Sequence, residues 1–335
     1  MQRTRRRRFL LAASALAAAP FARARVADTL QRVGLLFPSP MRTSEGSAVD
    51  FFSGILKELG WIAGQNLEVE YASGDGHEDR MPALAASLVQ KPIDVIWTAG
   101  PEAAVAAARA TRSIPIVFYG VAFPVEQGLV DSLAKPGRNV TGLASIAGAE
   151  RAKGLEVLLE IAPGLRRLVW LSVETVARTV SGEEMRIRTT AFESEAVALG
   201  FEVRKYPVST PADLDAAFAA MLQASPQALY CDFTAMTIRE RHRIAEFASR
   251  NRLPAVYGAW RFVEAGGLLS YGPNRGWMFR HSFTFVDRIL RGARPADLPV
   301  EFPTRFELVI NLKTARALGL SVAQSVLLRA DKVFE

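Results

Sequence analysis

Cysteine is almost absent from this chain of 335 residues: Cys231 is the only one, so no internal disulfide can form. Histidine is also scarce. His77, His242 and His281 lie in separate segments, and none has the H-x-x-x-H or C-x-x-C partner typical of a metal site. We therefore expect no metal ion, because a site for one would have to be assembled from carboxylates.

The usual motifs of enzyme active sites and nucleotide sites are missing as well. The sequence has no G-x-S-x-G nucleophile turn and no glycine-rich phosphate loop that ends in Gly-Lys-Ser/Thr. The stretch SGDGHED has glycines at 74 and 76, but Asp79 stands where a dinucleotide fingerprint needs its third glycine. We interpret this stretch as a loop, and we expect neither a catalytic set nor a cofactor.

A basic folded surface is also lacking. The net charge is +7, but the first 24 residues hold six arginines and no acid, which leaves +1 for the remainder. A nucleic-acid-binding protein needs a basic surface on its folded part to contact phosphates. We therefore expect no binding of nucleic acid.

The basic start of the chain has the layout of an export signal. The arginines end at Arg8, an apolar run extends from Phe9 to Phe21, and Ala22-Arg23-Ala24 matches an A-x-A cleavage site. The run of 13 residues is too short to span a bilayer as a helix. We interpret residues 1–24 as a signal peptide rather than a disordered basic tail. The stretch 6–10 matches the twin-arginine pattern R-R-x-F-L, and Sec export fits nearly as well.

The rest of the chain gives no sign of membrane attachment. No cysteine follows the apolar run, so a bacterial lipoprotein anchor is not expected. No later stretch has the roughly 18 consecutive apolar residues that a membrane helix needs. We expect a protein released into the bacterial periplasm and not inserted in the membrane. Its length suits two domains of about 150 residues each.

Short apolar runs alternate with longer amphipathic ones, which predicts parallel sheets covered by helices on both faces. The fold class is therefore α/β, with two Rossmann-like lobes. The predicted strands are 32–37, 66–73, 94–100 and 114–120, with a short one near Val140, and then 165–172, 201–209, 228–233, 254–259 and 267–272.

The final part predicts that the chain crosses between the two lobes more than once. A long helix is expected over 277–292, followed by prolines at 295, 299 and 303 and a strand at FELVIN. We place lobe 1 at 26–146 plus 274–296, and lobe 2 at 147–273 plus 297–335, joined by crossing strands.

Doubly wound sheets bind ligands at the carboxyl ends of their strands, and this rule selects candidate residues without assuming any catalysis. The selected positions are rich in hydroxyls, glycines and aromatic rings, which suits a small polar solute. They are Ser39, Thr98, Ala99, Gly100, Tyr119, Gly120, Val121, Thr141, Ser172, Asp232, Tyr257 and Tyr271.

Several of these residues have a second interpretation. Tyr257 and Tyr271 suit a ligand wall or ordinary packing equally well. Asp232 suits a ligand amine or a helix cap. By contrast, Trp97 and Tyr230 lie in mid-strand and are expected in the core. The helix that begins near Pro101 is expected to aim its amino terminus at an anion such as a carboxylate.

Four stretches resemble one family almost word for word: ELGWIAGQNLEVEYASGDG, IPIVFYGVAFPVEQGLVDSLAKPGRNVTGL, RLPAVYGAWRFVEAGGLLSYGPN and DRILRGARPADLPVEFPTRFELVINLKTARALGL. The family is that of ABC transporter substrate-binding proteins, of the tryptophan/tyrosine type. The resemblance extends from about Arg32 to Glu335. It implies the type I periplasmic binding protein fold, hinge closure on a small solute, and delivery to a membrane permease and its ATPase.

Two departures from the family bear on the solute. The loop after the fourth strand usually has Asp-Pro-Val in the family, and here it has Phe123-Pro124-Val125. The loss of this carboxylate favours a more apolar solute over an amine. The stretch YCDFTAMT also differs from the small, hydroxyl-rich segment that the resemblance leads us to expect.

We therefore expect a monomeric binding protein that captures an amino acid or another small carboxylate or aromatic solute. A ligand-sensing module for a membrane receptor is the first alternative, because it would use the same gap between the lobes. An enzyme on the same scaffold is the second, because a fold does not fix a function.

Overall fold

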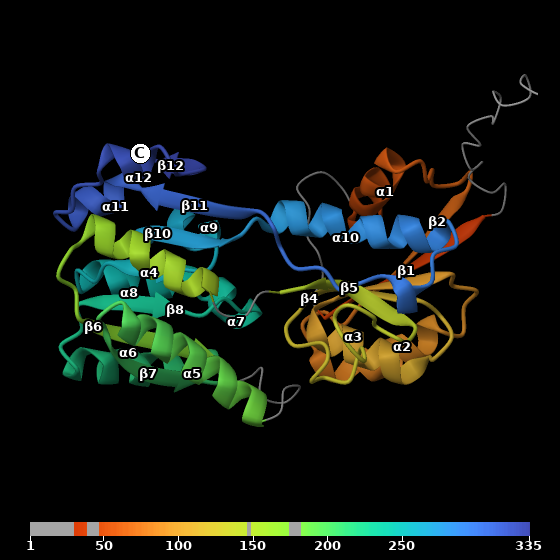
Figure 1. The fold of residues 1–335 in the computed structure, drawn as a ribbon, viewed down its shortest axis with the longest axis horizontal. Coiled ribbons are helices and arrows are strands. Elements are labelled where there is room, and N and C mark those ends of the chain that lie inside the picture. The colour runs from red at the N-terminus through yellow and green to blue at the C-terminus, as the bar shows by residue number, and fades with distance from the viewer. Residues whose placement is uncertain (1–29, 39–46, 146–148, 174–181) are drawn as a thin grey trace, which may run out of the picture.

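The computed structural model describes residues 30–38, 47–145, 149–173 and 182–335, and these residues form two lobes (Figure 1). The stretch interpreted as a signal peptide, 1–24, lies outside the described residues, and so does Ser39. No helix in the described ranges is long and apolar enough to cross a membrane.

Lobe 1 is built on a five-stranded parallel sheet in the order β2-β1-β3-β4-β5. Helices α2 (Met81–Leu88) and α3 (Gly100–Ala110) cover one face of this sheet, and α1 (Ala48–Glu58) and α10 (Arg275–Leu290) cover the other. The strands are β1 (Gln31–Phe37), β2 (Leu67–Ser73), β3 (Val95–Ala99), β4 (Ile116–Val121) and β5 (Val140–Ala144), with a short 3-10 helix η1 at Glu78–Arg80.

Lobe 2 carries a seven-stranded sheet in the order β12-β11-β10-β9-β8-β6-β7. Its strands are β6 (Arg167–Val173), β7 (Glu202–Val208), β8 (Ala228–Cys231), β9 (Ala255–Tyr257), β10 (Leu269–Pro273), β11 (Phe306–Asn311) and β12 (Lys332–Phe334). Its helices are α4 (Ala149–Ile161), α5 (Gly182–Ala198), α6 (Leu214–Gln223), α7 (Ala235–Arg239), α8 (Arg241–Arg250), α9 (Trp260–Glu264), α11 (Leu312–Ala317) and α12 (Gln324–Leu327), with a 3-10 turn η3 at Pro211–Asp213. The α/β class with two lobes is thus confirmed.

One strand of lobe 2 departs from the expected parallel arrangement, because β11 pairs with β10 in the antiparallel direction. The reason lies in the path of the chain. β10 ends at the side of lobe 2 that faces lobe 1, and the chain then forms α10 in lobe 1 before it returns as β11 (Figure 1). A strand that enters from that side runs back along its neighbour. β12 then pairs with β11 in parallel.

The chain passes three times between the lobes. The first passage lies between β5 and α4, the second between β10 and α10, and the third between lobe 1 and β11. Helix α10 belongs to the core of lobe 1, where Met278, Phe283 and Val286 are fully buried. A 3-10 turn, η4 (Pro295–Asp297), follows α10.

The third passage lies further along the chain than residue 296, where the sequence places the boundary of lobe 1. Leu298 and Val300 are buried in the two cores of lobe 1. The backbone of Glu301 bonds with β5, accepting from Ala144 N at 2.9 Å and donating to Gly142 O at 3.1 Å. The apolar residues of DLPV therefore pack in lobe 1, although the prolines around them indicate a connecting segment.

Two mid-strand aromatic residues lie in the core as predicted. Trp97 of β3 has no exposed surface, and Tyr230 of β8 is 3% exposed. Trp97 stacks between Tyr119, at 5.6 Å between ring centroids, and Phe283 of α10, at 5.2 Å. A helix that lies far away in the sequence therefore completes the aromatic core of lobe 1.

Candidate functional site

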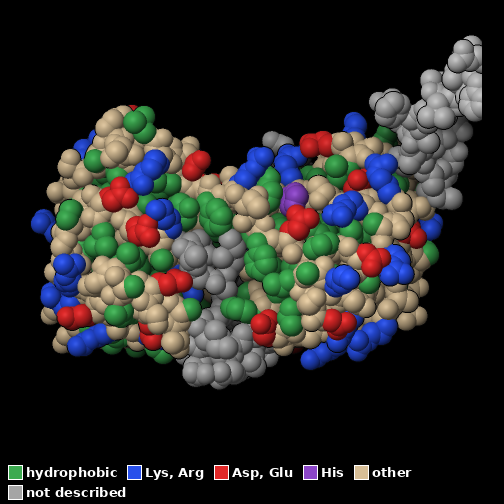
Figure 2. Space-filling model, viewed as in Figure 1, with side chains coloured by type: hydrophobic (Ala, Val, Ile, Leu, Met, Phe, Trp, Pro, Cys, Tyr) green, Lys and Arg blue, Asp and Glu red, His purple; other side chains and the backbone are tan. Residues whose placement is uncertain are grey.

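The candidate site consists of the carboxyl ends of the strands in the two lobes. The strand order reverses between β1 and β3 in lobe 1, and between β6 and β8 in lobe 2. At such a switch point the loops that follow neighbouring strands diverge to opposite faces and leave room for a ligand. Figure 2 shows a notch between the two lobes at the upper edge of the view.

Arg275, the first residue of α10, shows that these strand ends face each other. The Cζ atom of its guanidinium lies 4.2 Å from the ring centroid of Phe233, which follows β8 in lobe 2. The same atom lies 5.8 Å from the ring centroid of Tyr119, near the end of β4 in lobe 1. The ends of β4 and β8 therefore meet around one side chain of the second passage. Sequence reasoning missed Arg275, because it selected residues within each lobe separately, whereas the strand-end rule does reach Phe233, which directly follows Asp232.

In lobe 1, Thr98 and Ala99 are the last residues of β3 and Gly100 is the first residue of α3, so all three lie at the carboxyl end of the strand. Gly100 has φ +80°, a conformation in which a residue with a Cβ is strained. Thr98 has no exposed surface, and its hydroxyl has no hydrogen-bond partner within the described part of the chain. A buried unpaired hydroxyl costs about 1–3 kcal/mol. The carboxylate of Glu102 already lies in the first turn of α3, where a ligand anion was expected.

Three further candidates of lobe 1 follow or flank β4. Tyr119 is 9% exposed and contacts Arg275, whereas Val121 is fully buried in the core beneath. Gly120 between them has φ +75°, and nothing lies within 4 Å of the place where a Cβ would be. Tyr119 and Gly120 are thus brought to the edge of the gap, and the side chain of Val121 is not.

Thr141 lies near the start of β5, away from the carboxyl edge. Its hydroxyl is buried and donates a hydrogen bond of 2.7 Å to the carbonyl of Leu298. This bond holds the segment that precedes the third passage against lobe 1. The sequence suggests a strand centred on Val140, whereas β5 begins there and ends at Ala144.

In lobe 2, Asp232 and Ser172 lie at the ends of the adjacent strands β8 and β6. The carboxylate of Asp232 accepts hydrogen bonds from the indole nitrogen of Trp170, at 3.0 Å, and from the backbone of Val173, at 3.3 Å. Ser172 is 2% exposed. Asp232 does not cap the next helix, because the hydroxyl of Thr234 does so. Its carboxylate joins the ends of the two strands at the switch point of lobe 2.

Tyr257 and Tyr271, for which the sequence suggests either a ligand wall or ordinary packing, both pack against other aromatic rings. Tyr257 has no exposed surface and stacks on Phe262 at 4.7 Å, and burial raises the pKa of its hydroxyl far above the usual value. Its hydroxyl has no hydrogen-bond partner among the described residues. Tyr271 stacks on Phe306 of β11 at 5.8 Å. The structure therefore places Tyr257 in the core of lobe 2 and Tyr271 against the returning strand.

The remaining chemical groups do not gather at this site. Among the described residues, no three His, Cys, Asp or Glu side chains lie close enough together to hold a metal ion. Cys231 is buried, and burial, together with the charge of Asp232, raises the pKa of its thiol. His281 lies 2.6 Å from the carboxylate of Glu301, on lobe 1.

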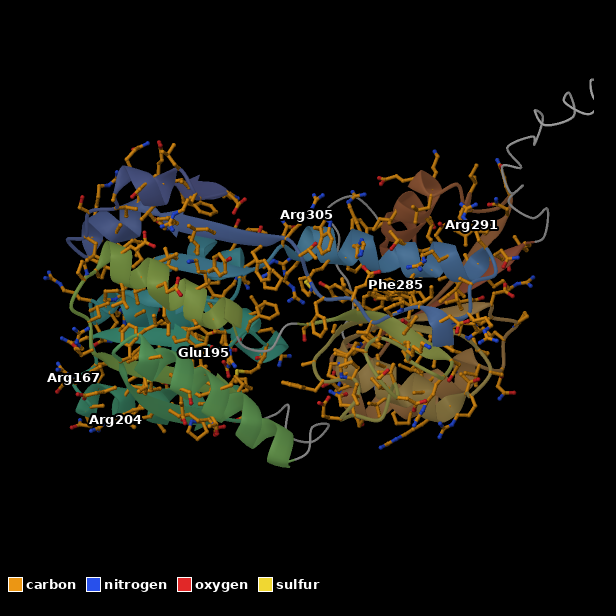
Figure 3. The ribbon with its side chains drawn as sticks, viewed as in Figure 1. Arg167, Glu195, Arg204, Phe285, Arg291 and Arg305 are labelled. Carbon is orange, nitrogen blue, oxygen red and sulfur yellow. The ribbon has the colours of Figure 1, made fainter. Side chains whose placement is uncertain are left out.

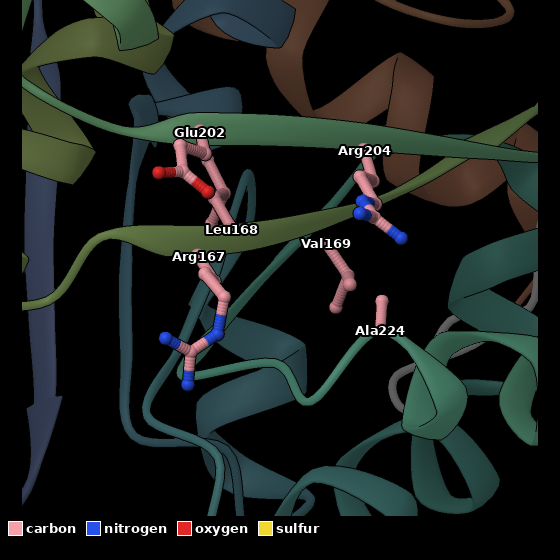
Figure 4. Close-up of a pocket in the computed structure, with 6 residues that line it drawn as sticks. All are labelled: Arg167, Leu168, Val169, Glu202, Arg204 and Ala224. Carbon is pink, nitrogen blue, oxygen red and sulfur yellow. The ribbon is translucent and has the colours of Figure 1, made fainter.

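Two hollows lie away from the strand ends. A cavity of about 10 Å³ lies at the amino ends of β6 and β7, opposite the candidate site, and Arg167, Glu202 and Arg204 help to line it (Figure 4). A shallow groove of about 260 Å³ lies between α1 and α10 on lobe 1, with Leu59 and Trp277 in its wall. Neither includes a residue that the strand-end rule selects.

The fold is that of the type I periplasmic binding proteins. The ABC domain of a Streptococcus pneumonia protein in complex with L-Trp superimposes with a TM-score of 0.78 at 22% identity, covering 91% of this chain and all of that one. The ligand-free, open structure of a substrate-binding protein with adhesive properties from Clostridium difficile superimposes with a TM-score of 0.70 at 22% identity. This match covers 91% of this chain and 99% of that one.

The sequence comparison identifies the family. The family of ABC transporter substrate binding proteins matches residues 44–334, so the chain belongs to this family. A tyrosine-binding protein of Clostridioides difficile (strain R20291) is 24% identical over 269 residues, which are 80% of this chain and 75% of that protein. The resemblance seen in the sequence is therefore confirmed, and the protein binds a solute for an ABC transporter.

Proposed function

We propose that this protein is exported to the periplasm, loses residues 1–24 as a signal peptide, and binds a small solute between its two lobes. The solute is an amino acid or another small carboxylate or aromatic compound. The protein releases it unchanged to an ABC permease with its ATPase, and works as a monomer. The observation that carries the proposal is the meeting of Tyr119 and Phe233, from opposite lobes, around Arg275.

Hinge closure explains how such a protein responds to its solute. The chain joins the lobes through three passages, and the loops that follow β4 and β8 belong to different lobes. A ligand that touches both loops binds the closed form better than the open form. It therefore shifts the population towards closure by its difference in affinity. We propose Thr98, Ala99, Gly100, Tyr119, Gly120, Ser172 and Asp232 as the wall of the site, with Phe233 added.

Two observations favour an aromatic or apolar body for the solute. The relatives include a tyrosine-binding protein and a structure in complex with L-Trp. Phe123, in place of the aspartate that the family usually has, adopts φ +52° just after β4. A bulky residue in this left-handed region costs about 1–3 kcal/mol, and such strain is concentrated at functional sites. A phenylalanine retained there adds an apolar ring beside the strand ends.

A thermal-shift screen tests the proposal directly. The library contains amino acids, purines and small carboxylates, and a true ligand raises the melting temperature by mass action. At 100 times its Kd a ligand adds about 2.7 kcal/mol of stability, which corresponds to several degrees. Mass spectrometry of the recovered ligand then shows whether it is unchanged. A hit that the protein converts chemically would contradict the proposal and favour an enzyme, and a library without any hit would contradict solute binding of this class.

A further inference from the structure

Arg275 carries a positive charge that no described residue neutralises by direct contact. No carboxylate of the described ranges lies within 4.0 Å of its guanidinium nitrogens, and its donors make no hydrogen bond to a described group. Its contacts are with the faces of the rings of Phe233 and Tyr119. A guanidinium has five N–H donors, so this side chain is held in place while its donors stay available.

Two acidic residues close to Arg275 in the fold, Asp232 and Glu307, have other hydrogen-bond partners. Asp232, next to Phe233, accepts from Trp170 and Val173. Glu307 lies in β11 opposite Gly272 of β10, and it accepts from the amide of Asn274 at 3.4 Å. Burial, then the charge of Asp331, raises the pKa of Glu307, although Arg275 and Lys332 act in the opposite direction. Arg275 is therefore close enough to influence Glu307 but is not paired with it.

The surroundings of Arg275 suit a carboxylate of a small ligand. The side chain is half-buried, so its charge is less screened than that of a fully exposed arginine. Its planar fork can donate two parallel hydrogen bonds to the two oxygens of one carboxylate. Because its rings come from both lobes, an anion bound there lies at the junction of the lobes rather than on one of them.

We propose that Arg275 binds the carboxylate of the solute and is the residue that selects solutes with a carboxylate over those without one. This inference rests on the proposed function and makes it more specific. The rings of Phe233 and Tyr119 orient the guanidinium, and the ligand's carboxylate accepts hydrogen bonds from its donors.

The test compares carboxylates with their own primary amides. Isothermal titration calorimetry measures the affinity of the wild-type protein for each hit of the library, and for L-tryptophan, L-tyrosine and their amides. The variants are Arg275→Met, which removes the charge and keeps the apolar stem, and Arg275→Lys, which keeps the charge without the fork. Arg305→Met is the matched control. Arg305 lies on the third passage (Figure 3), is exposed, and also contacts a ring, that of Trp277 at 5.7 Å.

We expect a loss of binding affinity for ligands that carry a carboxylate and little change for their amides. Arg275→Met should weaken binding of a carboxylate about 10- to 100-fold and change binding of its amide little, since a hydrogen bond to a charged group is lost. The affinity of Arg275→Lys for a carboxylate should lie between those of wild type and Arg275→Met. The affinity of Arg305→Met should stay within about 2-fold of wild type. Melting curves without ligand show that each variant folds.

Two results would overturn the inference while the proposed function stands. The first is a carboxylate affinity that is equal in Arg275→Met and wild type. The second is a wild-type protein that binds only amides or cationic compounds. A wild-type protein that binds nothing in the library would instead contradict the proposed function, and this inference with it.

Discussion

The two lobes share one plan but complete it in different ways. In each, five strands follow the order second, first, third, fourth, fifth, as β2-β1-β3-β4-β5 and as β7-β6-β8-β9-β10. Lobe 1 then gains a helix, α10, which packs over its sheet after the second passage. Lobe 2 gains strands β11 and β12 at its sheet edge after the third. A sheet face needs cover and a sheet edge needs pairing, and each returning segment supplies one of these.

Each lobe has a buried tryptophan, and the two indole nitrogens have different kinds of hydrogen-bond partner. The indole nitrogen of Trp97 donates to the hydroxyl of Ser282 on α10 at 2.9 Å, within the core of lobe 1. The indole nitrogen of Trp170 donates instead to Asp232 at the strand ends of lobe 2. Lobe 1 thus uses its tryptophan to hold a distant helix, and lobe 2 uses its tryptophan to fix a carboxylate at the candidate site.

The largest expected effect comes from Trp97→Ala. This change removes two ring stacks and the bond to Ser282, and truncation of a buried Trp costs about 3–5 kcal/mol. Urea unfolding followed by circular dichroism should show the loss in a transition that belongs to lobe 1. Trp260→Ala is the control, because Trp260 of α9 is only partly buried, and it should cost less. A loss below about 1 kcal/mol for Trp97→Ala would refute the role assigned to α10.

The next effect compares two glycines on the fifth strand of each lobe. A Cβ added at Gly142 of β5 would lie 2.1 Å from the carbonyl oxygen of Phe118, and one added at Gly272 of β10 would lie 2.4 Å from that of Gly258. Both strands lead directly to a passage between the lobes. We expect each Gly→Ala change to cost about 1–3 kcal/mol of unfolding free energy or more, because the backbone must shift.

Gly142→Ala should cost more than Gly272→Ala, since three backbone atoms of Phe118 would lie within 2.9 Å of its Cβ. The same urea experiment measures both. Gly54→Ala is the control: Gly54 is on the exposed side of α1 with nothing within 4 Å of an added Cβ. That change should stabilise the protein by about 0.5–1 kcal/mol. Equal stability of all three variants would show that the close strand approach is unimportant.

The smallest expected effect is a change in how the free energy of unfolding depends on pH, and it comes from Glu307 in lobe 2. Because burial raises the pKa of Glu307, the folded protein keeps this proton to a higher pH than the unfolded chain does. The free energy of unfolding therefore falls as the pH rises from about 4 through the folded pKa. Glu307→Gln keeps an oxygen acceptor for Asn274 and should remove this fall, with a gain below about 1 kcal/mol at pH 7.

Melting temperatures of wild type and Glu307→Gln between pH 3 and pH 8 check this expectation. The two proteins should be alike at the acid end and should diverge as the pH rises. Divergence in the opposite sense, with the variant weaker at pH 7, would mean that the ionised carboxylate stabilises lobe 2.

Much of the fold follows from local patterns in the sequence. The apolar strands and their helices predict both sheets, and the long helix expected over 277–292 corresponds to α10 at Arg275–Leu290. The strand-end rule leads to Thr98, Gly100, Tyr119 and Asp232, since the end of a strand can be read from the residues that follow it. Thr141 was misplaced because β5 is short and its end was set too early.

The sequence by itself determined the two α/β units, the family, and the edge of each sheet at which a ligand is expected, because hydrophobic periodicity and turn residues are local properties. Only the tertiary structure decided that β11 runs antiparallel, that residues 298–301 stay with lobe 1, and that Arg275 meets Phe233 and Tyr119. These features depend on where a segment lies after it has crossed between lobes. No pattern of neighbouring residues contains that position, since it is fixed by packing between parts of the chain that lie far apart in the sequence.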